Sequence, residues 1–531
     1  MKYPIGIQDF KSIIEDGYVY VDKTALVFSM ANEGKTYFLS RPRRFGKSLL
    51  VSTLEHYFRG EKKLFEGLAI MQFEKEWKEY PIFHIDFNGT AFQDGLALKK
   101  LIEGTVAGWE KQYSFEGNAD YSIGKRFADL LAHVHKVTGK RCVVLIDEYD
   151  KPLLDVLDSG RSTIDGNGEK IDIEDYNREL LKAFYSAFKM ADADLKFVLL
   201  TGVTKFAQVS VFSGFNQPKD ISMDREYDAL CGISAEELEM VFHEEMDDMA
   251  VDMEVSPEEM RRILKQQYDG YHFSRGKMDI YNPFSVLNAL SRKELGDYWF
   301  STGTPTYLVR LLTHTNENLN ELTGKYYDSS EFVDYKADVE LPLPMIYQSG
   351  YLTIKDYDKY SNSYLLDLPN NEVKKGFLTL IASNYLGAKV SAGTLIIQLV
   401  RAIQKDDLDV WRKSLTAFFA SIPYSMRRKE EEHEKERYFH YTFYLIFRIL
   451  STYVVFTELQ QSEGRADCVI EMEKAIYIFE FKLDGTADEA LQQIEKKGYA
   501  RPYLGGKRPI RKIGVSFSSQ TGTIDDWRVE Q

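Results

Sequence analysis

The stretch TYFLSRPRRFGKSLLVSTLEHYF, residues 36–58, decides the fold of the first part of the chain. It divides into a short apolar strand at 36–40, a loop at 41–47 and a helix at 48–58. A strand, a loop and a helix with Gly-Lys-Ser at the join form the setting that a phosphate-binding loop requires, because the helix N-terminus offers free N–H groups to an anion. A Gly-Lys-Ser triplet alone is a weak signal.

Three consecutive residues of this loop have separate expected roles. Gly46 lets the backbone approach a phosphate, Lys47 reaches the β and γ oxygens, and the Ser48 hydroxyl is a ligand for Mg²⁺. Arg41 occupies the place where the first glycine of such a loop usually stands. The loop is therefore expected to bind ATP with Mg²⁺, with one departure from the common pattern.

A second segment supports a nucleotide site. Residues 143–146 are a fully apolar run closed by Asp147 and Glu148, as expected of a buried central strand that delivers two carboxylates to its C-terminal edge. Asp147 would hold Mg²⁺ through water, and Glu148 would polarise the attacking water. The alternative, a strand that ends in a solvated acidic turn, is disfavoured by the Gly-Lys-Ser segment upstream.

A third strand is expected at 196–200 and runs into TGVTK. Thr201, Thr204 or Lys205 could therefore sense the γ-phosphate from an adjacent strand end. Small polar residues after a strand are usually turn formers, and that interpretation stays open. From residue 36 to residue 200 short apolar strands alternate with helical stretches, which predicts a parallel α/β sheet.

Three segments of this region resemble the AAA-ATPase-like family, which is common in bacterial proteins. They are YVDKTALV at 20–27, RPRRFGKSLL at 41–50 and LIDEYDKPL at 145–153. The resemblance covers roughly residues 4–230 and implies the fold of a P-loop NTPase. The family has an Arg-rich form of the phosphate loop, which accounts for the missing first glycine.

The resemblance also implies how a nucleotide is held. ATP would be bound by Gly46, Lys47 and Ser48. Independently of the resemblance, Arg44 and Thr201 are expected as further contacts with the nucleotide. The rate of ATP hydrolysis stays open, and no arginine finger can be assigned. The candidates for the finger are Arg43, Arg44 and Arg225.

The length predicts several domains, because 531 residues exceed what one hydrophobic core supports. After residue 231 the sequence becomes mostly helical, beginning with a segment in which Ser234 can cap a helix and Glu237 follows three residues on, as in a capping box. Nearly every residue of RRKEEEHEKER at 427–437 is charged, which indicates an exposed junction. The expected domains are a P-loop domain at 1–231, a helical lid or winged-helix-like region at 232–323, a mixed spacer at 324–425 and a further α/β domain at 426–531.

The formal net charge of −15 argues against adhesion of the whole surface to nucleic acid, because phosphate binding relies on Lys and Arg. Seven basic residues near the C-terminus could form a local basic patch, although a solvated basic face is an equally good interpretation. They are Lys496, Lys497, Arg501, Lys507, Arg508, Arg511 and Lys512.

Localisation is indicated by what the sequence lacks. Three scattered cysteines without a CxxC pattern give no sign of a disulfide framework or a structural zinc site, which fits a reducing cytoplasm. The first residues, MKYPIGIQDFKSIIEDG, lack the apolar core of a signal peptide, and no apolar run reaches the roughly 18 residues of a membrane span. We therefore expect a cytoplasmic protein without membrane segments.

The second candidate site follows from strand register. Strands are expected at 467–472 and 475–482, and a tight turn of even length between them pairs Asp467 with Glu480. Two carboxylates opposed at about 5 Å repel each other unless a cation lies between them. A divalent metal would resolve this conflict.

Lys482 leaves the same face of its strand as Glu480, because side chains two residues apart point to one side. A metal pair with an ammonium beside it suits activation of a water and stabilisation of the charge that develops on a phosphodiester. Charged groups on an otherwise apolar strand are costly to bury. This cost favours a site over the alternative, an ion pair between Glu480 and Lys482 on an edge strand.

Three segments at this end resemble the PD-(D/E)XK nuclease superfamily over roughly residues 426–531. They are GRAD at 464–467, EFK at 480–482 and QIEKKGYA at 493–500. The expected elements are a helix at 438–450, strands at 453–459, 467–472 and 475–482, a helix at 487–499 and a last strand at 512–517. This order, αβββαβ, also fits a restriction-endonuclease-like domain. The whole chain is then α/β, with an N-terminal P-loop NTPase sheet, a helical lid, a mixed helical spacer and this C-terminal domain.

The second resemblance implies that Asp467, Glu480 and Lys482 are catalytic, with the two acids holding the metal. Ala466 stands in place of the usual proline, and Gln493 would lie on the following helix and face the site. A further acid on the preceding helix often completes the metal site in such enzymes. The candidates are Glu436 and Glu458.

One hypothesis accounts for both sites: an ATP-regulated nuclease that cleaves nucleic acid, with DNA favoured over RNA, using Mg²⁺ or Mn²⁺. The alternative is a nucleotide-dependent switch or scaffold whose nuclease-like domain binds nucleic acid or a partner without cleaving it. A plain ATPase with a structural C-terminal domain is a third interpretation, and homo-oligomerisation is left open.

Overall fold

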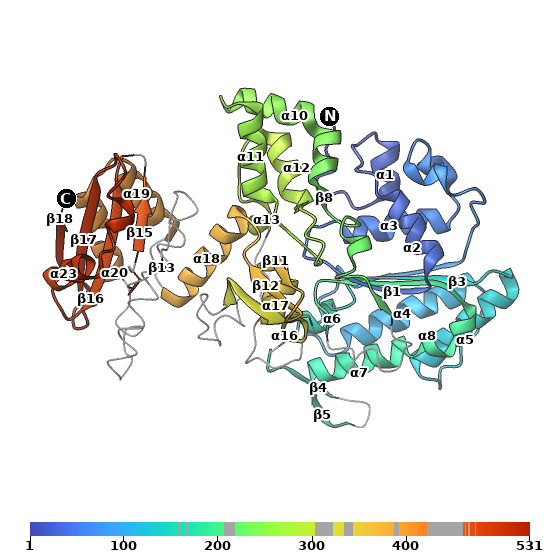
Figure 1. Cartoon of the computed structure of the whole chain (residues 1–531). Coiled ribbons are helices and arrows are strands. Elements are labelled where there is room, and N and C mark those ends of the chain that lie inside the picture. The colour runs from blue at the N-terminus through green and yellow to red at the C-terminus, as the bar shows by residue number, and fades with distance from the viewer. Residues whose placement is uncertain are drawn as a thin grey trace. The chain divides into compact units, whose positions relative to one another are not determined.

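The computed structural model describes residues 1–157, 159–164, 168–206, 218–302, 322–333, 343–386, 392–421, 460–461, 464–465, 468–472 and 474–530. The chain divides into two compact units, unit 1 (Met1–Glu372) and unit 2 (Val373–Gln531), shown in Figure 1.

Unit 1 is built on a five-stranded sheet in which every neighbouring pair of strands is parallel. The strand order is β2 (Ile82–Asp86), β3 (Cys142–Asp147), β6 (Leu195–Gly202), β1 (Thr36–Ser40) and β7 (Lys219–Asp220). All 6 residues of β3 are buried, as expected of a parallel strand that is covered on both faces. β6 lies between β1 and β3, so its end adjoins both the phosphate loop and the two carboxylates. The expected parallel P-loop sheet is confirmed.

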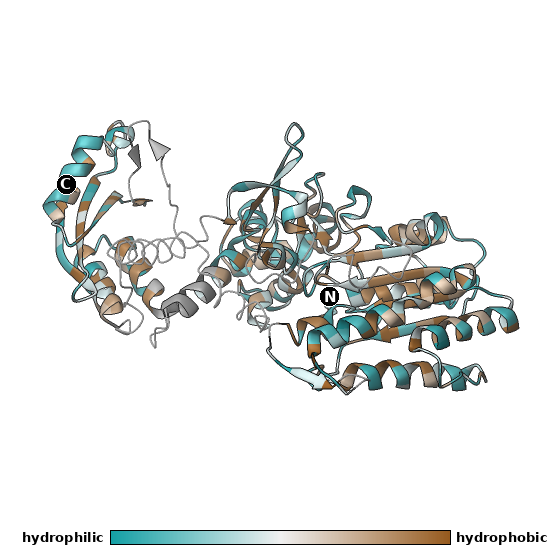
Figure 2. Cartoon of the chain, turned by 90° about the horizontal axis from the view of Figure 1, so that it is seen from below, coloured by the Kyte–Doolittle hydropathy of each residue, from teal (hydrophilic) through white to brown (hydrophobic). Residues whose placement is uncertain are grey.

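Helices cover both faces of this sheet (Figure 1). One face is covered by α1 (Phe10–Glu15), α2 (Thr24–Glu33) and α3 (Lys47–Phe58), and the other by α4 (Ala97–Gln112), α5 (Ile123–Thr138), α7 (Ile173–Tyr185) and α8 (Ala187–Met190). Shorter elements are α6 (Lys151–Leu154) and the paired strands β4 (Ser162–Ile164) and β5 (Lys170–Asp172). Figure 2 shows hydrophobic strands between helices whose outer sides are hydrophilic, which is the pattern that buries one core between layers.

A helical subdomain, which we call the lid, follows the sheet. It contains α10 (Ala235–Asp252), α11 (Pro257–Tyr268), α12 (Pro283–Arg292) and α13 (Tyr298–Ser301), with the short strand pair β8 (Ile233–Ser234) and β9 (Ile280–Tyr281) at its base. The capping box expected at Ser234 and Glu237 is confirmed at the start of α10. Buried residues of the three long helices form one core, against which Tyr3, Ile5 and Val21 of the N-terminal segment pack.

The stretch expected to be a spacer contributes to both units. Its first part forms a three-stranded antiparallel sheet in unit 1, in the order β10 (Lys325–Asp328), β12 (Ser363–Asp367) and β11 (Thr353–Asp358). Two short helices, α16 (Ser329–Phe332) and α17 (Leu343–Gln348), accompany this sheet. α18 (Asn371–Leu386) begins in unit 1 and belongs to unit 2 from Val373 onward.

Unit 2 contains a four-stranded mixed sheet in the order β15 (Cys468–Glu471), β16 (Ile476–Leu483), β17 (Ile510–Ser518) and β18 (Thr523–Glu530). β16 and β17 are parallel, and the outer pairs are antiparallel. α23 (Ala487–Lys497) packs on one face so closely that a Cβ at Gly514 would lie 2.1 Å from the Ala487 carbonyl oxygen. The other face is covered by α19 (Ala392–Gln404) and α20 (Leu408–Ser421), with the rings of Trp411 and Phe479 4.9 Å apart.

The last strand of this sheet was not predicted from the sequence. The strand expected at 512–517 is not the last, because β18 follows it and pairs antiparallel with it. β18 alternates acidic, basic and apolar side chains and is mostly exposed, so its apolar signal is weak. The helix expected at 438–450 and the strand expected at 453–459 lie outside the described residues. Among the helices that the structure describes, none has the length and apolar character to cross a membrane.

Candidate nucleotide site and candidate nuclease site

The phosphate loop joins β1 to α3 through two residues in the left-handed region. Gly46, at the N-terminus of α3, has φ 93°, a conformation that glycine adopts without strain. Arg44 has φ 67° and is exposed, with its guanidinium 5.1 Å from the ring of Phe284 in α12. Ser48 is the second residue of α3, so the Gly-Lys-Ser triplet lies at the helix N-terminus as expected.

The side chain of Arg41 anchors the phosphate loop to neighbouring segments of unit 1. Its side chain is only 1% exposed, and it donates to the carbonyl oxygens of Ser222 (2.7 Å) and Tyr227 (3.1 Å). The guanidinium also lies 4.1 Å from the centre of the Phe273 ring. The residue that replaces the usual first glycine therefore ties the loop to the segment after β7 and to the lid.

Lys47 is buried inside the loop. Its ammonium donates to the carbonyl oxygens of Arg41 (3.1 Å) and Pro42 (3.3 Å) and lies 3.8 Å from Glu148 Oε1. The lysine of the loop and the second acid after β3 thus share one small region.

The carboxylates after β3 are held by the neighbouring strand β6. Asp147 Oδ1 accepts a hydrogen bond from Thr201 Oγ1 (2.5 Å) and another from the backbone N–H of Glu148 (3.1 Å). Thr201, expected to contact the nucleotide, is fully buried and positions Asp147. Glu148 has φ 54°, which costs about 1–2 kcal/mol for a residue with a Cβ and is typical of functional positions.

Asp150 was missed by the sequence analysis. It is fully buried, and its Oδ2 accepts hydrogen bonds from the N–H groups of Val203 (2.9 Å) and Thr204 (2.6 Å) and from Thr204 Oγ1 (2.7 Å). Burial, and after it the charge of Glu148, raises the pKa of Asp150 to about 6. The only available signal was a third acid directly after the acidic strand end.

The remaining candidates of this region have other contacts. The Thr204 hydroxyl donates a hydrogen bond to Asp150, and Lys205 forms an ion pair with Asp220 at 2.9 Å. Arg43 is exposed, but its carbonyl oxygen accepts the indole N–H of Trp299 at 2.9 Å. Arg225, the last arginine-finger candidate, is exposed in the short helix Arg225–Tyr227.

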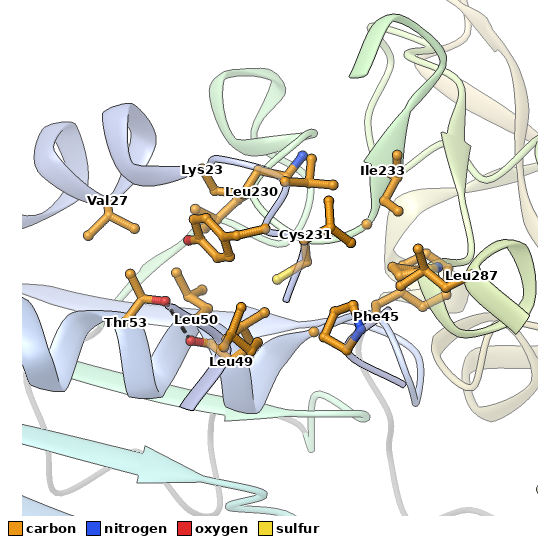
Figure 3. A pocket seen from close by; sticks show the side chains of 18 of the residues that line it. Lys23, Val27, Phe45, Leu49, Leu50, Thr53, Leu230, Cys231, Ile233 and Leu287 are labelled. Carbon is orange, nitrogen blue, oxygen red and sulfur yellow. Dashed lines mark hydrogen bonds between the residues drawn. The ribbon is translucent and has the colours of Figure 1, made fainter. Parts of the chain in front are cut away.

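A largely apolar pocket adjoins Gly46 (Figure 3). Three segments that are far apart in the sequence form its walls: the N-terminal segment, the start of α3 and the lid. Representative lining residues are Tyr20 and Lys23 of the first, Leu49 of the second, and Ile233, Phe242 and Leu287 of the third. No local pattern could have revealed it, because its walls meet only in the folded chain.

In unit 2, one amide bridges the acid and the lysine of the EFK motif. Glu480 is 2% exposed, and its Oε1 accepts a hydrogen bond from Nε2 of Gln493 in α23. Gln493 Oε1 in turn accepts from Lys482 Nζ at 2.6 Å, and Lys482 Nζ lies 4.0 Å from Glu480 Oε1. The structure therefore brings together three of the expected site residues on the α23 face of the sheet.

The strand register also agrees with the expectation where it is described. β15 pairs Cys468 with Phe479 and Val469 with Ile478, which is the register that places Asp467 opposite Glu480. Asp467 itself lies outside the described residues, as do Ala466, Glu436 and Glu458. Within the described ranges, no group of three or more His, Cys, Asp or Glu side chains is arranged to hold a metal ion.

The expected basic patch is partly neutralised. Arg508 pairs with Glu471 at 2.6 Å, Arg511 pairs with Asp406 at 2.9 Å, and Lys512 pairs with Glu495. At least three of the seven basic residues therefore serve the packing of unit 2.

Comparisons with known proteins concern both units. Residues 4–212 match the family described as "Predicted AAA-ATPase", and residues 434–527 match the "PD-(D/E)XK nuclease superfamily". A protein of Azotobacter chroococcum mcd 1, described as "Uncharacterized protein in vnfD 5'region", is 35% identical over 540 residues, covering 100% of this chain and 99% of that protein. Among solved structures, the Aeropyrum pernix ORC2 protein in its ADPNP–ADP complexes is 11% identical over 70% of this chain and 99% of that chain. Its TM-score of 0.18 carries no argument about the fold.

A phosphate loop after β1 and two carboxylates at the end of β3, on a parallel sheet, are the features of the P-loop NTPase fold. The chain belongs to the predicted AAA-ATPase family and carries a C-terminal domain of the PD-(D/E)XK nuclease superfamily.

Proposed function

We propose that this protein binds and hydrolyses ATP in unit 1 and that the nucleotide controls metal-dependent cleavage of nucleic-acid phosphodiesters by unit 2. The first part rests on the phosphate loop. Its Gly46 lines the apolar pocket, and the ammonium of the next residue, Lys47, lies 3.8 Å from Glu148 Oε1. The observation that carries the second part is the contact set of Glu480, Gln493 and Lys482.

The nucleotide site divides the ligand between two environments. The apolar pocket suits a purine base, and the phosphates would lie along the N-terminus of α3, where N–H groups and Lys47 offer positive charge. Ser48 and Asp147 would hold Mg²⁺, which neutralises charge on the phosphates. Glu148 would orient the attacking water, and Thr201 keeps Asp147 in place.

At the nuclease site, Glu480 and Asp467 would hold Mg²⁺ or Mn²⁺, which supplies an activated water. Lys482 would stabilise the negative charge that develops on the phosphodiester. Gln493 fixes both side chains at once, because its two amide atoms bond to different partners. DNA is the substrate that we favour over RNA.

A chain of hydrogen bonds supports nucleotide control. The indole N–H of Trp299 donates to the carbonyl oxygen of Arg43 in the phosphate loop (2.9 Å), and the backbone N–H of Trp299 donates to Glu372 Oε1 (2.6 Å). Glu372 is 1% exposed and lies in the first turn of α18, the helix that continues into unit 2. A change in the phosphate loop on nucleotide binding would therefore alter the hydrogen bonds at the start of α18.

The test is a cleavage assay with the purified full chain, labelled DNA and RNA, and Mg²⁺ or Mn²⁺, with and without ATP. Lys482→Ala should lower the rate of cleavage by about 100-fold or more, because it removes a charge that stabilises the transition state. Lys413→Ala, an exposed lysine of α20 outside the site, is the matched control and should cleave like the parent. Equal cleavage by Lys482→Ala and the parent would remove the nuclease assignment.

The second candidate function is a nucleotide-dependent switch whose unit 2 binds nucleic acid or a partner without cleavage. The net charge of −15 and the ion-paired basic residues of unit 2 favour it. Calorimetric titration with Mn²⁺ separates the two functions. A nuclease binds the ion with a loss of affinity in Glu480→Gln, whereas a non-catalytic module has no need for it.

A further inference from the structure

A partly buried ion pair joins the N-terminal segment to the lid beside the apolar pocket. Lys23, which lines the pocket, donates to both carboxylate oxygens of Glu237 in α10, at 2.6 and 2.5 Å. The side chains of Lys23 and Glu237 are only 11% and 23% exposed. This pair is a charged contact between two of the three segments that form the pocket.

The Lys23 side of the pair is fixed to the body of unit 1. Its neighbour Asp22 accepts hydrogen bonds from the N–H groups of Thr24 (2.8 Å) and Ala69 (2.7 Å). The Thr24 hydroxyl accepts the N–H of Ile70 at 3.1 Å. Lys23 therefore projects from an anchored turn just before α2.

The Glu237 side is fixed to the lid. Glu237 Oε2 accepts the backbone N–H of Ser234 at 2.8 Å, and Ser234 Oγ accepts the N–H of Glu237 at 3.2 Å. This capping box sets the first turn of α10. The same carboxylate thus caps the first helix of the lid and binds the lysine of the opposite wall.

Stability alone is a weak reason for such a pair. Removing two charges from water costs about as much as their attraction returns, so an apolar pair would pack at least as well. The position of the pair is more informative, because Phe242 and Leu287 of the lid line the same pocket. A contact that fixes the first turn of α10 also fixes this wall.

We propose that Lys23 and Glu237 form a latch that holds the lid over the base pocket and sets how slowly a bound nucleotide leaves. The proposal rests on the proposed ATP site. Both residues act by positioning the lid, and the chemistry of hydrolysis is left to the phosphate loop and Glu148.

The test uses the full chain and stopped-flow release of a fluorescent ATP analogue from the parent, Lys23→Met, Glu237→Gln and the double variant. Lys23→Met keeps the apolar stem, and Glu237→Gln keeps an acceptor for the capping box, because Gln serves at this position as well as Glu. Each single change should speed release about tenfold, the double variant should add little to either, and association should change by less than about twofold. A tenfold change corresponds to about 1.4 kcal/mol of nucleotide affinity.

Inorganic triphosphate separates the latch from a general loss of structure. It has no base, so its affinity should be the same in the parent and in the latch variants. Lys125→Met removes an exposed ion pair of α5 with Asp129 and is the matched control, with parent-like release.

Three results would overturn the latch. Unchanged release from both single variants, a parallel loss of triphosphate affinity, or additive effects in the double variant would each do so. A parent protein that binds neither the ATP analogue nor triphosphate would overturn the ATP site itself, and the latch with it.

Discussion

The two candidate sites hold their acids in different ways. In unit 1, Asp147 ends strand β3 and Asp150 follows it, and both accept hydrogen bonds from the end of the neighbouring strand β6 or the residues just after it. In unit 2, Glu480 and Lys482 leave one face of a single strand and are joined by an amide from α23. The positions of the acids in unit 1 are therefore set by the pairing of strands in the sheet. The positions of Glu480 and Lys482 are set by one side chain, that of Gln493.

The largest expected effect is that of Glu148, the acid next to Asp147 at the site between the strands. Glu148→Gln should keep ATP binding and lower the rate of hydrolysis by about 100-fold or more, because it removes the group that orients the attacking water. Phosphate release measured at saturating ATP tests it. Glu103→Gln, an exposed acid of α4, serves as the control. Parent-like hydrolysis by Glu148→Gln would mean that the acids after β3 only build structure.

The bridge in unit 2 predicts a smaller effect. Gln493→Ala should lower the rate of nucleic-acid cleavage about tenfold, because Glu480 and Lys482 lose the amide that orients both of them. Gln492→Ala, the exposed neighbour on the same helix, should leave cleavage unchanged. If both variants behave alike, the bridge does not position the site.

The sequence predicts the parts of these sites that depend on local patterns, and it does not predict the contacts between distant segments. The Gly-Lys-Ser triplet, the apolar strand before Asp147 and the register of β15 and β16 are local patterns, and the structure has each where it was expected. The role of Arg41 as an anchor, the bond from Thr201 to Asp147 and the pocket walls depend on segments that meet only after folding. Local patterns cannot specify such contacts, because side chains at strand ends have several neighbours within reach.

Buried Asp150 predicts a dependence of stability on pH. Its pKa is raised from the ordinary value of 3.8 to about 6, with burial as the main cause. A raised pKa means that the folded protein binds the proton more tightly, so this group stabilises the fold at low pH and that contribution is lost as the pH rises from about 4 through about 6. The loss is about 3 kcal/mol, because each pKa unit corresponds to roughly 1.4 kcal/mol.

Asp150→Asn tests this prediction, because an amide keeps an acceptor for Thr204 but does not ionise. Between pH 4.5 and pH 7.5, the thermal midpoint of the parent should fall relative to that of Asp150→Asn by a few degrees. A constant difference between the two proteins across this range would show that Asp150 does not titrate there. The result bears on unit 1 alone, because Asp150 lies in that unit.

The smallest expected effect concerns communication between the two sites. Trp299→Phe keeps an aromatic ring next to Tyr351, whose ring centre lies 5.2 Å away, but removes the N–H that binds the Arg43 carbonyl oxygen. The ratio of cleavage rates with and without ATP should then move about twofold toward one, while ATP affinity and basal cleavage stay near the parent values. Paired measurements of ATP binding and cleavage on the same preparations decide it. An unchanged ratio would mean that the path from the phosphate loop through Glu372 to α18 does not carry the signal, and that the two sites either act separately or communicate through another contact.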